Sequence, residues 1–476
     1  MTDQATTLIN GRWIELPARK TVTNPATGEA VGTICWGGSS TAAEAADAAA
    51  AAFPSWSATP ARIRADILNR AAALLLERRS QIAPLLAMEA GKRLAEAEGE
   101  LTFSAEYIRW FAEEVRQSKG SVLSEEDPAR RHLTTRSAAG VVVSLTSWNF
   151  PCSLQARKLA PALAAGCTVV ARVSERAPLA AVELFRVFVD AGVPAGVINL
   201  VHGPSQELTN TLLEHPKTRV VTFTGSTPVG RRIMAKAAER VMRPLLELGG
   251  DAPFIVFDDA DLDAAVEGAV TAKTRNTGQS CVGANRFLVQ DGIYEDFTTK
   301  LAARLDALKI VGGASAATES DLGPMIDMQA VAGVQKMVDE ALALGATELT
   351  TPREVPAGGS YLRPMLFADV PPTALLAQEE VFGPVAAVFR FTSEAEAVEL
   401  ANRTEMGLAA YVFSKDAGRC WRTAEALEAG IVGINDAVAS VAFAPMGGVK
   451  QSGLGREGSN VGLEEFTETK YLAWRA

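Results

Sequence analysis

One stretch of the chain decides the fold: residues 140–201 read GVVVSLTSWNFPCSLQARKLAPALAAGCTVVARVSERAPLAAVELFRVFVDAGVPAGVINLV. Short runs of β-branched residues alternate in it with segments of helical period. The runs lie at 141–145, 167–171 and 197–201, and the helical segments lie near 153–165 and 178–191. Strands that alternate with helices form βαβ units, whose strands pair in parallel. The stretch therefore predicts an α/β fold built on a parallel sheet.

The same alternation returns in the second half of the chain. Strands are expected at 254–257, 287–289, 385–391 and 409–413, and helices at 261–275 and 293–308. A segment of helical period at 60–118 precedes the first sheet and is expected to cover it. The two alternations meet at Gly249-Gly250 without a flexible linker. We therefore expect two packed domains with a tight hinge and a ligand-binding cleft between them.

The composition disfavours several classes of protein. The 476 residues carry a formal net charge of −10, so no overall positive field exists to attract nucleic acid or an anionic membrane. No apolar run reaches about eighteen residues, and the N-terminus MTDQATTLIN lacks the basic and apolar regions of a secretory leader. The five cysteines are scattered, and the three histidines have no partner at ligand spacing. We expect a cytoplasmic protein with no metal site, membrane span or nucleic-acid partner.

Cys281 is the best candidate for a nucleophile. It ends the motif GQSC (residues 278–281), where a glycine and small neighbours allow a substrate to reach the thiol. The alternative is a buried structural cysteine, which is the expected state of the other four. The motif alone does not decide between these two interpretations.

Two further side chains could assist such a nucleophile. Glu247 lies in LLELGG (residues 245–250), where flanking leucines would partly desolvate the carboxylate and make it a useful general base. Asn149 lies in SWNFP, just after the strand 141–145 and hence at the carboxyl end of a parallel sheet. Its amide could donate to a developing oxyanion. The competing interpretation of Glu247 is a satisfied buried acid.

A phosphate-binding turn is expected in FTGSTPVG, residues 223–230. The segment follows a strand and opens a helix, so Gly225 and Ser226 can present backbone and hydroxyl donors to a pyrophosphate. It differs from the usual G-x-G-x-x-G fingerprint, and a plain strand-to-helix connection is the commoner role of such a junction.

The motifs taken together resemble one family. SWNFP, FTGSTPVG, LELGG, GQSC, EEVFGPV and GGVKQSGLGRE occur in that order, and the set closely resembles the aldehyde dehydrogenase superfamily. The resemblance runs from about Asn24 to the C-terminus. The stretches DAPFIVFDDADLDAAVEGA and GGVKQSGLGREGS look most like the succinic semialdehyde dehydrogenase branch.

The resemblance implies a reaction and a role for each candidate. Cys281 would attack an aldehyde, with the Asn149 amide and the Cys281 backbone N–H as oxyanion hole, and would carry the acyl group as a thioester. Glu247 would activate the water that hydrolyses this thioester to a carboxylic acid. The alternatives are a coenzyme A-acylating enzyme, whose relatives generally lack this base, and a non-catalytic binding protein on the same fold.

A nicotinamide dinucleotide is the implied cofactor. By the same resemblance Glu380 and Phe382 would hold the nicotinamide ribose and ring, Gly225 and Ser226 the pyrophosphate, and Arg172 with Glu175 the adenosine ribose. Glu175 would repel the 2′-phosphate of NADP, which favours NAD. Arg172 replaces the common lysine and could accept that phosphate, so NADP use stays open.

An acid-terminated aldehyde needs a fixed cation at the far end of its pocket. Arg157 and Arg275 match the arginines that bind the distal carboxylate in succinic semialdehyde dehydrogenases, and Ser440 could add a hydroxyl. The alternative for either arginine is an ordinary ion pair with an acid. Another semialdehyde or a neutral aldehyde is the alternative substrate.

The resemblance also implies an architecture. It places a Rossmann-like dinucleotide-binding domain at 1–125 and 147–249, an α/β catalytic domain at 250–455, and a small β oligomerisation element at 126–146 and 456–476. The segment EEDPARRHLTTRS (residues 125–137) is polar, and a projecting hairpin there would need a partner to protect its edges. A homodimer or homotetramer is expected.

Overall fold

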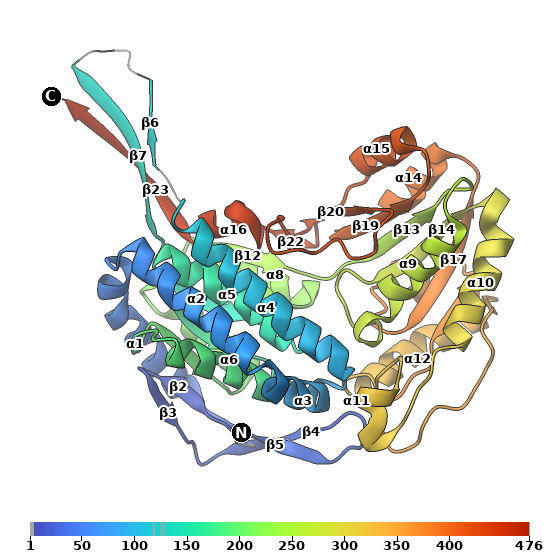
Figure 1. Ribbon diagram of the computed structural model, residues 1–476, viewed down its shortest axis with the longest axis horizontal. Helices are drawn as coiled ribbons and strands as arrows, with labels where there is room; N and C mark the ends of the chain where they lie inside the picture. Colours follow the sequence, from blue (N-terminus) through green and yellow to red (C-terminus); the bar gives the residue numbers. More distant parts are fainter. Residues whose placement is uncertain (1–3, 118–119, 125–126, 128, 476) are drawn as a thin grey trace.

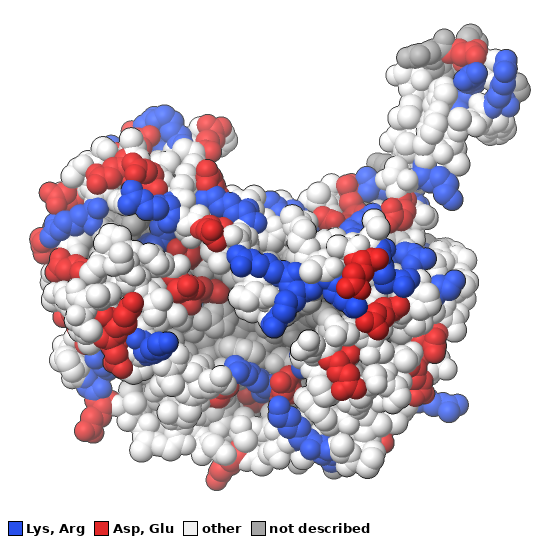
Figure 2. All heavy atoms as spheres, turned by 180° about the vertical axis from the view of Figure 1, so that it is seen from behind, with Lys and Arg blue, Asp and Glu red and all other residues white. Residues whose placement is uncertain are grey.

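The computed structural model describes residues 4–117, 120–124, 127 and 129–475, and it contains two α/β bodies and a projecting sheet (Figure 1). The α/β fold class predicted from the alternation is confirmed. Within these residues, no helix is both long and apolar enough to cross a membrane. The face in Figure 2 shows basic and acidic side chains interspersed.

The first body is built on an eight-stranded sheet with the order β22-β12-β11-β8-β9-β10-β2-β3. The five strands from β8 to β12 run parallel, and the other three pair antiparallel at the two ends. The predicted strands are confirmed to within a few residues. The bounds are β2 Thr7–Ile9, β3 Arg12–Ile14, β8 Val141–Leu145, β9 Thr168–Arg172, β10 Ile198–Val201, β11 Thr218–Thr224, β12 Arg243–Glu247 and β22 Gly453–Leu454.

Helices cover both faces of this sheet. One apolar core joins it to α2, α3, α4, α5 and α6, and another joins its opposite face to α1, α7 and α8. Figure 1 shows α2, α4 and α5 side by side, and the predicted helical layer is confirmed. The bounds are α1 Ser39–Ser57, α2 Ala61–Glu77, α3 Arg79–Ala90, α4 Leu94–Glu114, α5 Pro151–Ala165, α6 Leu179–Asp190, α7 Ser205–Glu214 and α8 Thr227–Ala238.

The second body has a seven-stranded sheet, ordered β15-β16-β17-β14-β13-β19-β20 and parallel except for β15. Helices α9 and α10 cover one face, and α12, α14 and α15 cover the other. The bounds are β13 Ala252–Val256, β14 Ala284–Gln290, β15 Thr347–Glu348, β16 Met365–Ala368, β17 Val385–Phe391, β19 Ala409–Phe413, β20 Ile431–Ile434, α9 Leu262–Thr274, α10 Tyr294–Asp306, α12 Met328–Ala343, α14 Glu394–Asn402 and α15 Ala417–Ala426.

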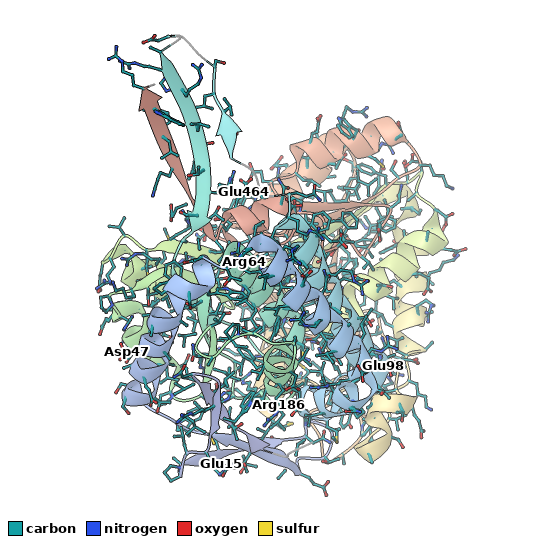
Figure 3. The ribbon with its side chains drawn as sticks, turned by 60° about the vertical axis from the view of Figure 1, so that its left-hand side comes forward. Glu15, Asp47, Arg64, Glu98, Arg186 and Glu464 are labelled. Carbon is teal, nitrogen blue, oxygen red and sulfur yellow. The ribbon has the colours of Figure 1, made fainter. Side chains whose placement is uncertain are left out.

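A three-stranded antiparallel sheet projects from the first body, in the order β23-β7-β6. Figure 3 shows side chains extending from it, with Glu464 at its base, where Arg136 pairs with Glu464 at 3.0 Å. The bounds are β6 Ser121–Val122, β7 Arg130–Ala138 and β23 Thr467–Arg475. β23 is an edge strand, and its side chains beyond Thr467 are exposed.

Several expected boundaries need correction. Ser121–Val122, assigned to the dinucleotide-binding domain, form β6 of the projecting sheet, and Gly453–Leu454, assigned to the catalytic domain, form β22 of the eight-stranded sheet. The segment 126–146, assigned to the projecting element, includes β8, which lies in the middle of the eight-stranded sheet with all five residues buried. An apolar run this fully buried belongs to a covered parallel sheet. We therefore end the projecting element near Gly140.

The remaining elements connect these parts. A small sheet has the order β1-β5-β4, and β18 pairs with β21. The bounds are β1 Gln4–Ala5, β4 Arg19–Thr23, β5 Ala30–Cys35, β18 Met406–Gly407, β21 Val449–Lys450, α11 Ala316–Glu319, α13 Leu375–Gln378, α16 Ser459–Glu464, and three 3₁₀ turns at Arg275–Gly278, Asp291–Ile293 and Gly313–Ser315.

Candidate active site

The fold brings three candidate residues toward the junction of the two bodies. Asn149 follows the carboxyl end of β8, Glu247 is the last residue of β12, and Cys281 lies in the loop between α9 and β14. Gly250, three residues after Glu247, packs against the Cys281 loop, because a Cβ at this position would lie 2.4 Å from the carbonyl oxygen of Cys281. The second glycine of LELGG is therefore required by close packing against the cysteine loop.

The loop that carries Cys281 has an unusual backbone. Asn276, Thr277 and Gly278 all have positive φ, at 51°, 58° and 75°. The Asn276 amide donates to the carbonyls of Asn149 at 3.0 Å and Gln279 at 3.2 Å. These bonds hold a conformation that L-residues disfavour, and they fix the cysteine loop to the loop after β8.

Asn149 is buried, and both ends of its side chain are held. Its amide donates to the carbonyl of Gln279 at 3.2 Å, and its Oδ1 accepts from the Ser147 hydroxyl at 2.6 Å. The bond to Gln279 keeps the amide in the cysteine loop, where a donor to an oxyanion on the substrate would be needed.

A buried ion pair between Lys92 and Glu100 fixes the backbone at Asn149. The Lys92 ammonium donates to the Asn149 carbonyl at 2.8 Å and pairs with Glu100 at 2.5 Å. The other Glu100 oxygen accepts from the backbone N–H groups of Cys152 and Ser153 in the first turn of α5. Lys92 and Glu100 were not predicted, because the Asn149 carbonyl and the Cys152 N–H that they contact lie more than fifty residues away along the chain.

Cys281 is half-buried and lines a cavity together with Ser440, Met446 and the two candidate arginines. Burial and the charge of Glu247 raise the pKa of its thiol well above the ordinary value, while Arg157 opposes this rise. The sulfur is therefore a neutral thiol at rest and must lose its proton to become a nucleophile.

Glu247 is almost completely buried, at 2% exposure. No described N–H group donates a hydrogen bond to its carboxylate, its only ion pair among the described residues is with Arg157 Nη2, at 3.6 Å, and the Cys281 thiol lies within hydrogen-bonding reach. Buried carboxylates are usually hydrogen-bonded, and a free one beside a thiol is suited to accept a proton.

The cavity beside Cys281 includes all three candidate substrate residues. Arg157, Arg275 and Ser440 line it, together with the apolar side chains of Phe103, Phe150, Leu154 and Met446. Arg275 is half-buried over the Phe150 ring, 5.4 Å from its centre, and has no acidic partner within the described part of the chain. Arg157 differs, because it is buried and pairs with Glu457 at 3.2 Å as well as with Glu247. Arg275 is thus the cavity arginine whose charge no described acid neutralises.

The candidate adenosine-ribose residues form a charged cluster after β9. Arg172 Nη2 lies 2.6 Å from Glu175, and Lys20 from β4 lies 3.8 Å from the other carboxylate oxygen. Partial burial alone would raise the pKa of Glu175, but Arg172 and Lys20 outweigh it and lower the pKa. Lys20 was not predicted, since β4 is far from β9 in sequence.

The other candidate cofactor residues lie in the connection from β11 to α8 and in the loop before β17. Gly225 and Ser226 join β11 to α8, with Ser226 at the N-cap. Glu380 accepts from the Gly250 N–H at 3.3 Å, and burial raises its pKa to about 8. The Phe382 ring packs edge-on against Trp148, with 5.7 Å between ring centres. The charged groups after β9, the N-terminus of α8 and the half-buried Glu380 fit a dinucleotide at the carboxyl ends of parallel strands.

The chain is similar to known proteins over nearly its whole length. Residues 13–472 match the model of the aldehyde dehydrogenase family. This chain belongs to the aldehyde dehydrogenase family. A glutarate-semialdehyde dehydrogenase of Pseudomonas putida is 45% identical over 466 residues, which cover 98% of this chain and 96% of the relative. A succinate-semialdehyde dehydrogenase [NADP(+)] of Escherichia coli is 44% identical over 467 residues, with 98% and 96% covered.

Solved structures of this family share the same fold. A succinate-semialdehyde dehydrogenase from Burkholderia pseudomallei superposes with a TM-score of 0.97 at 45% identity, covering 99% of this chain and 98% of that one. The aldehyde dehydrogenase described here is therefore an NAD(P)-dependent enzyme that oxidises an aldehyde, as its motifs predicted.

Proposed function

We propose that this aldehyde dehydrogenase oxidises an acid-terminated aldehyde, a short semialdehyde such as succinic semialdehyde, to the dicarboxylic acid. The observation that carries the proposal is Arg275, a half-buried guanidinium without an acidic partner in the described residues, in the same cavity as Cys281. An unpaired cation in a partly apolar cavity favours a ligand carboxylate. Similar enzymes named for succinate and glutarate semialdehydes support the same class.

The chemistry starts at the thiol. Glu247 takes the proton of Cys281, and the sulfur then bonds to the aldehyde carbon. The oxyanion that forms is stabilised by the Asn149 amide and the Cys281 backbone N–H. A bound NAD(P), held by Glu380, Phe382 and the turn at Gly225 and Ser226, would supply the acceptor for the hydride of this carbon, and the acyl group stays on Cys281 as a thioester. Glu247 releases the thiol proton to solvent and then accepts a proton from the water that hydrolyses the thioester.

Hydrolysis is proposed over transfer to coenzyme A because Glu247 is placed next to Cys281 with no competing hydrogen bond within the described residues. The two outcomes differ in their products. Free dicarboxylic acid formed at an undiminished rate without coenzyme A supports hydrolysis, and a requirement for coenzyme A contradicts it.

For the cofactor, we propose NAD with NADP also accepted. Glu175 would disfavour a 2′-phosphate, but its charge is neutralised by Arg172 and Lys20. The net charge of these three groups is therefore positive, which permits a phosphate nearby.

The proposal is tested by initial rates with succinic semialdehyde, glutaric semialdehyde and a neutral aldehyde of similar length, each with NAD and with NADP. We expect a higher kcat/KM for the two acid-terminated aldehydes. Replacement of Arg275 by Met should remove most of this preference and leave the neutral aldehyde little affected. A wild-type preference for the neutral aldehyde contradicts the proposed substrate class.

A further inference from the structure

Arg157 lies between two buried acids, and one of them is the proposed general base. Its Nη2 is 3.6 Å from Glu247 Oε2, its Nε is 3.2 Å from Glu457 Oε2, and its Nη1 contacts the Met446 sulfur. All three nitrogens of the guanidinium therefore have a neighbour. The same side chain lines the cavity that contains Cys281 and the unpaired Arg275.

The two acids are held to different degrees. Glu457 also pairs with Lys158, and although burial alone would raise its pKa, Lys158 and Arg157 outweigh it and lower the pKa, so that Glu457 stays ionised. Glu247 has only the longer contact with Arg157 as an ion pair among the described residues, and its remaining polar neighbour there is the Cys281 thiol. Glu247 is thus the partner that a competing anion displaces more easily.

The geometry of carboxylate binding identifies what must move. An end-on, bidentate carboxylate uses both Nη atoms of an arginine. Here those two atoms face Met446 and Glu247, while Nε faces Glu457. A ligand carboxylate that binds Arg157 in this way takes over the contact now made by Glu247 and leaves the contact with Glu457 in place.

We infer that Arg157 is a substrate-operated restraint on the general base: it holds Glu247 at rest, and the distal carboxylate of the bound substrate replaces Glu247 on the guanidinium and frees it for hydrolysis. Arg157 is then a positioning residue for Glu247 in addition to a ligand of the substrate. The inference rests on the proposed function, because only an acid-terminated acyl group supplies the competing carboxylate.

The step that is controlled is deacylation. The oxygen of a water molecule bonds to the thioester carbon, one water proton passes to the Glu247 carboxylate, and the bond between that carbon and the Cys281 sulfur breaks with the electron pair staying on sulfur. The products are the free carboxylic acid and the Cys281 thiolate. A carboxylate oxygen that faces a guanidinium is directed away from the attacking water, so the contact with Arg157 slows this step.

A neutral aldehyde should still acylate Cys281, because a thiol is a much stronger acid than water and gives its proton even to a restrained Glu247, but it should deacylate slowly. Rapid mixing of the enzyme and NAD with acetaldehyde should give a burst of NADH close to the concentration of active sites, followed by a slow steady rate. Succinic semialdehyde should give no such burst. Addition of propionate, which can occupy Arg157 beside the short acetyl group, should raise the steady rate with acetaldehyde by about tenfold or more, within the range typical of a general base.

A variant of Arg157 is compared with a variant of an arginine outside the cavity. Arg157→Met should abolish the acetaldehyde burst by speeding deacylation, and it should remove the response to propionate. Arg70→Met, which removes a guanidinium that donates to the Ala191 carbonyl away from the cavity, should keep the burst. Loss of a purely structural arginine would lower the rates, whereas the inference requires a faster deacylation.

The results separate the inference from the proposed substrate class. If succinic semialdehyde has the higher kcat/KM but acetaldehyde shows no burst and wild-type turnover ignores propionate, the restraint is wrong and the substrate class stands. The wild-type experiments need no variant, so misfolding of Arg157→Met does not leave the question open. If acid-terminated aldehydes are not preferred at all, the proposed function fails first.

Discussion

The proposed nucleophile is held as a thiol in the resting enzyme. Burial and the charge of Glu247 both raise the pKa of Cys281, and only Arg157 acts in the opposite direction among the cations that influence it most. A cysteine of this kind depends on a neighbouring base, and Glu247 is the base that the fold provides. Acylation and deacylation therefore both depend on the Glu247 carboxylate.

Glu247→Gln tests this double dependence. The amide cannot accept the proton from Cys281 or from water, so we expect steady-state turnover to fall by about 10²- to 10⁴-fold. Binding of NAD, followed by quenching of tryptophan fluorescence, should change little. Turnover that stays within a few-fold of the wild type would show that another group serves as base.

The raised pKa of Cys281 predicts a steep pH dependence of alkylation. Below the pKa, each unit of pH increases the thiolate fraction by about tenfold, and the thiolate is the form that reacts with iodoacetamide. The rate at Cys281, measured by mass spectrometry of its peptide, should still rise between pH 8 and pH 10, where an ordinary thiol of pKa ≈ 8.5 levels off. A plateau below pH 8 would contradict the shift.

Helices α4 and α5 position the candidate active-site residue Asn149. Lys92, just before α4, and Glu100 within it hold the first turn of α5 and the carbonyl of Asn149 through fully buried polar contacts. Arg64, labelled in Figure 3, ties α2 to the other end of α5 by donating to the Ala164 carbonyl at 2.9 Å. The position of the oxyanion donor thus depends on helices that also line the substrate cavity, α4 through Glu100 and Phe103 and α5 through Leu154 and Arg157.

Lys92→Met should weaken both the fold and the oxyanion hole. Removal of one partner from a buried ion pair costs about 3–5 kcal/mol of stability. We expect a lower kcat with little change in the Kd of NAD, and an effect on kcat that is not additive with Asn149→Ala, because both changes act on one group. Additive effects in the double variant would assign Lys92 a structural role only.

At the scale of the whole molecule, the projecting sheet leaves an unpaired edge. β23 exposes Tyr471, Leu472 and Trp474, and edge strands of this kind commonly pair with another chain. We expect a homo-oligomer that uses this sheet, with a dimer as its basic unit. The large side chains of β23 would then be covered by a partner subunit.

Deletion of residues 467–475 tests the assembly. Light scattering coupled to size-exclusion chromatography should give a smaller oligomer or a monomer for the shortened chain and a dimer or tetramer for the full chain. Arg475→Ala is the control, since it leaves the strand and its large apolar side chains intact. An unchanged mass after deletion would place the interface elsewhere.

Much of the fold could be predicted from the sequence because the pattern is local. Strands such as 141–145, 385–391 and 409–413 are continuous apolar runs, and the structure places strands at the same residues. The motif residues Asn149, Glu247 and Cys281 could also be chosen from the sequence, since each follows or ends an element in a recognisable segment. Their roles remain proposals, and the structure contributes their neighbours.

The sequence by itself determined the two α/β alternations, the family and the residue types able to carry the chemistry, because these depend on short segments and on their order. The ion pairs that the charged side chains form became visible in the folded chain alone. Arg157 and Arg275 look alike in sequence, yet one is paired with Glu457 and Glu247 and the other is free of acidic partners among the described residues. Lys20 contacts Glu175, and Lys92 contacts Asn149. The residues of each pair lie far apart in the sequence, so a local sequence pattern cannot predict these contacts. Ion pairs and burial depend on distances in the folded chain, and those distances are set by packing of whole elements.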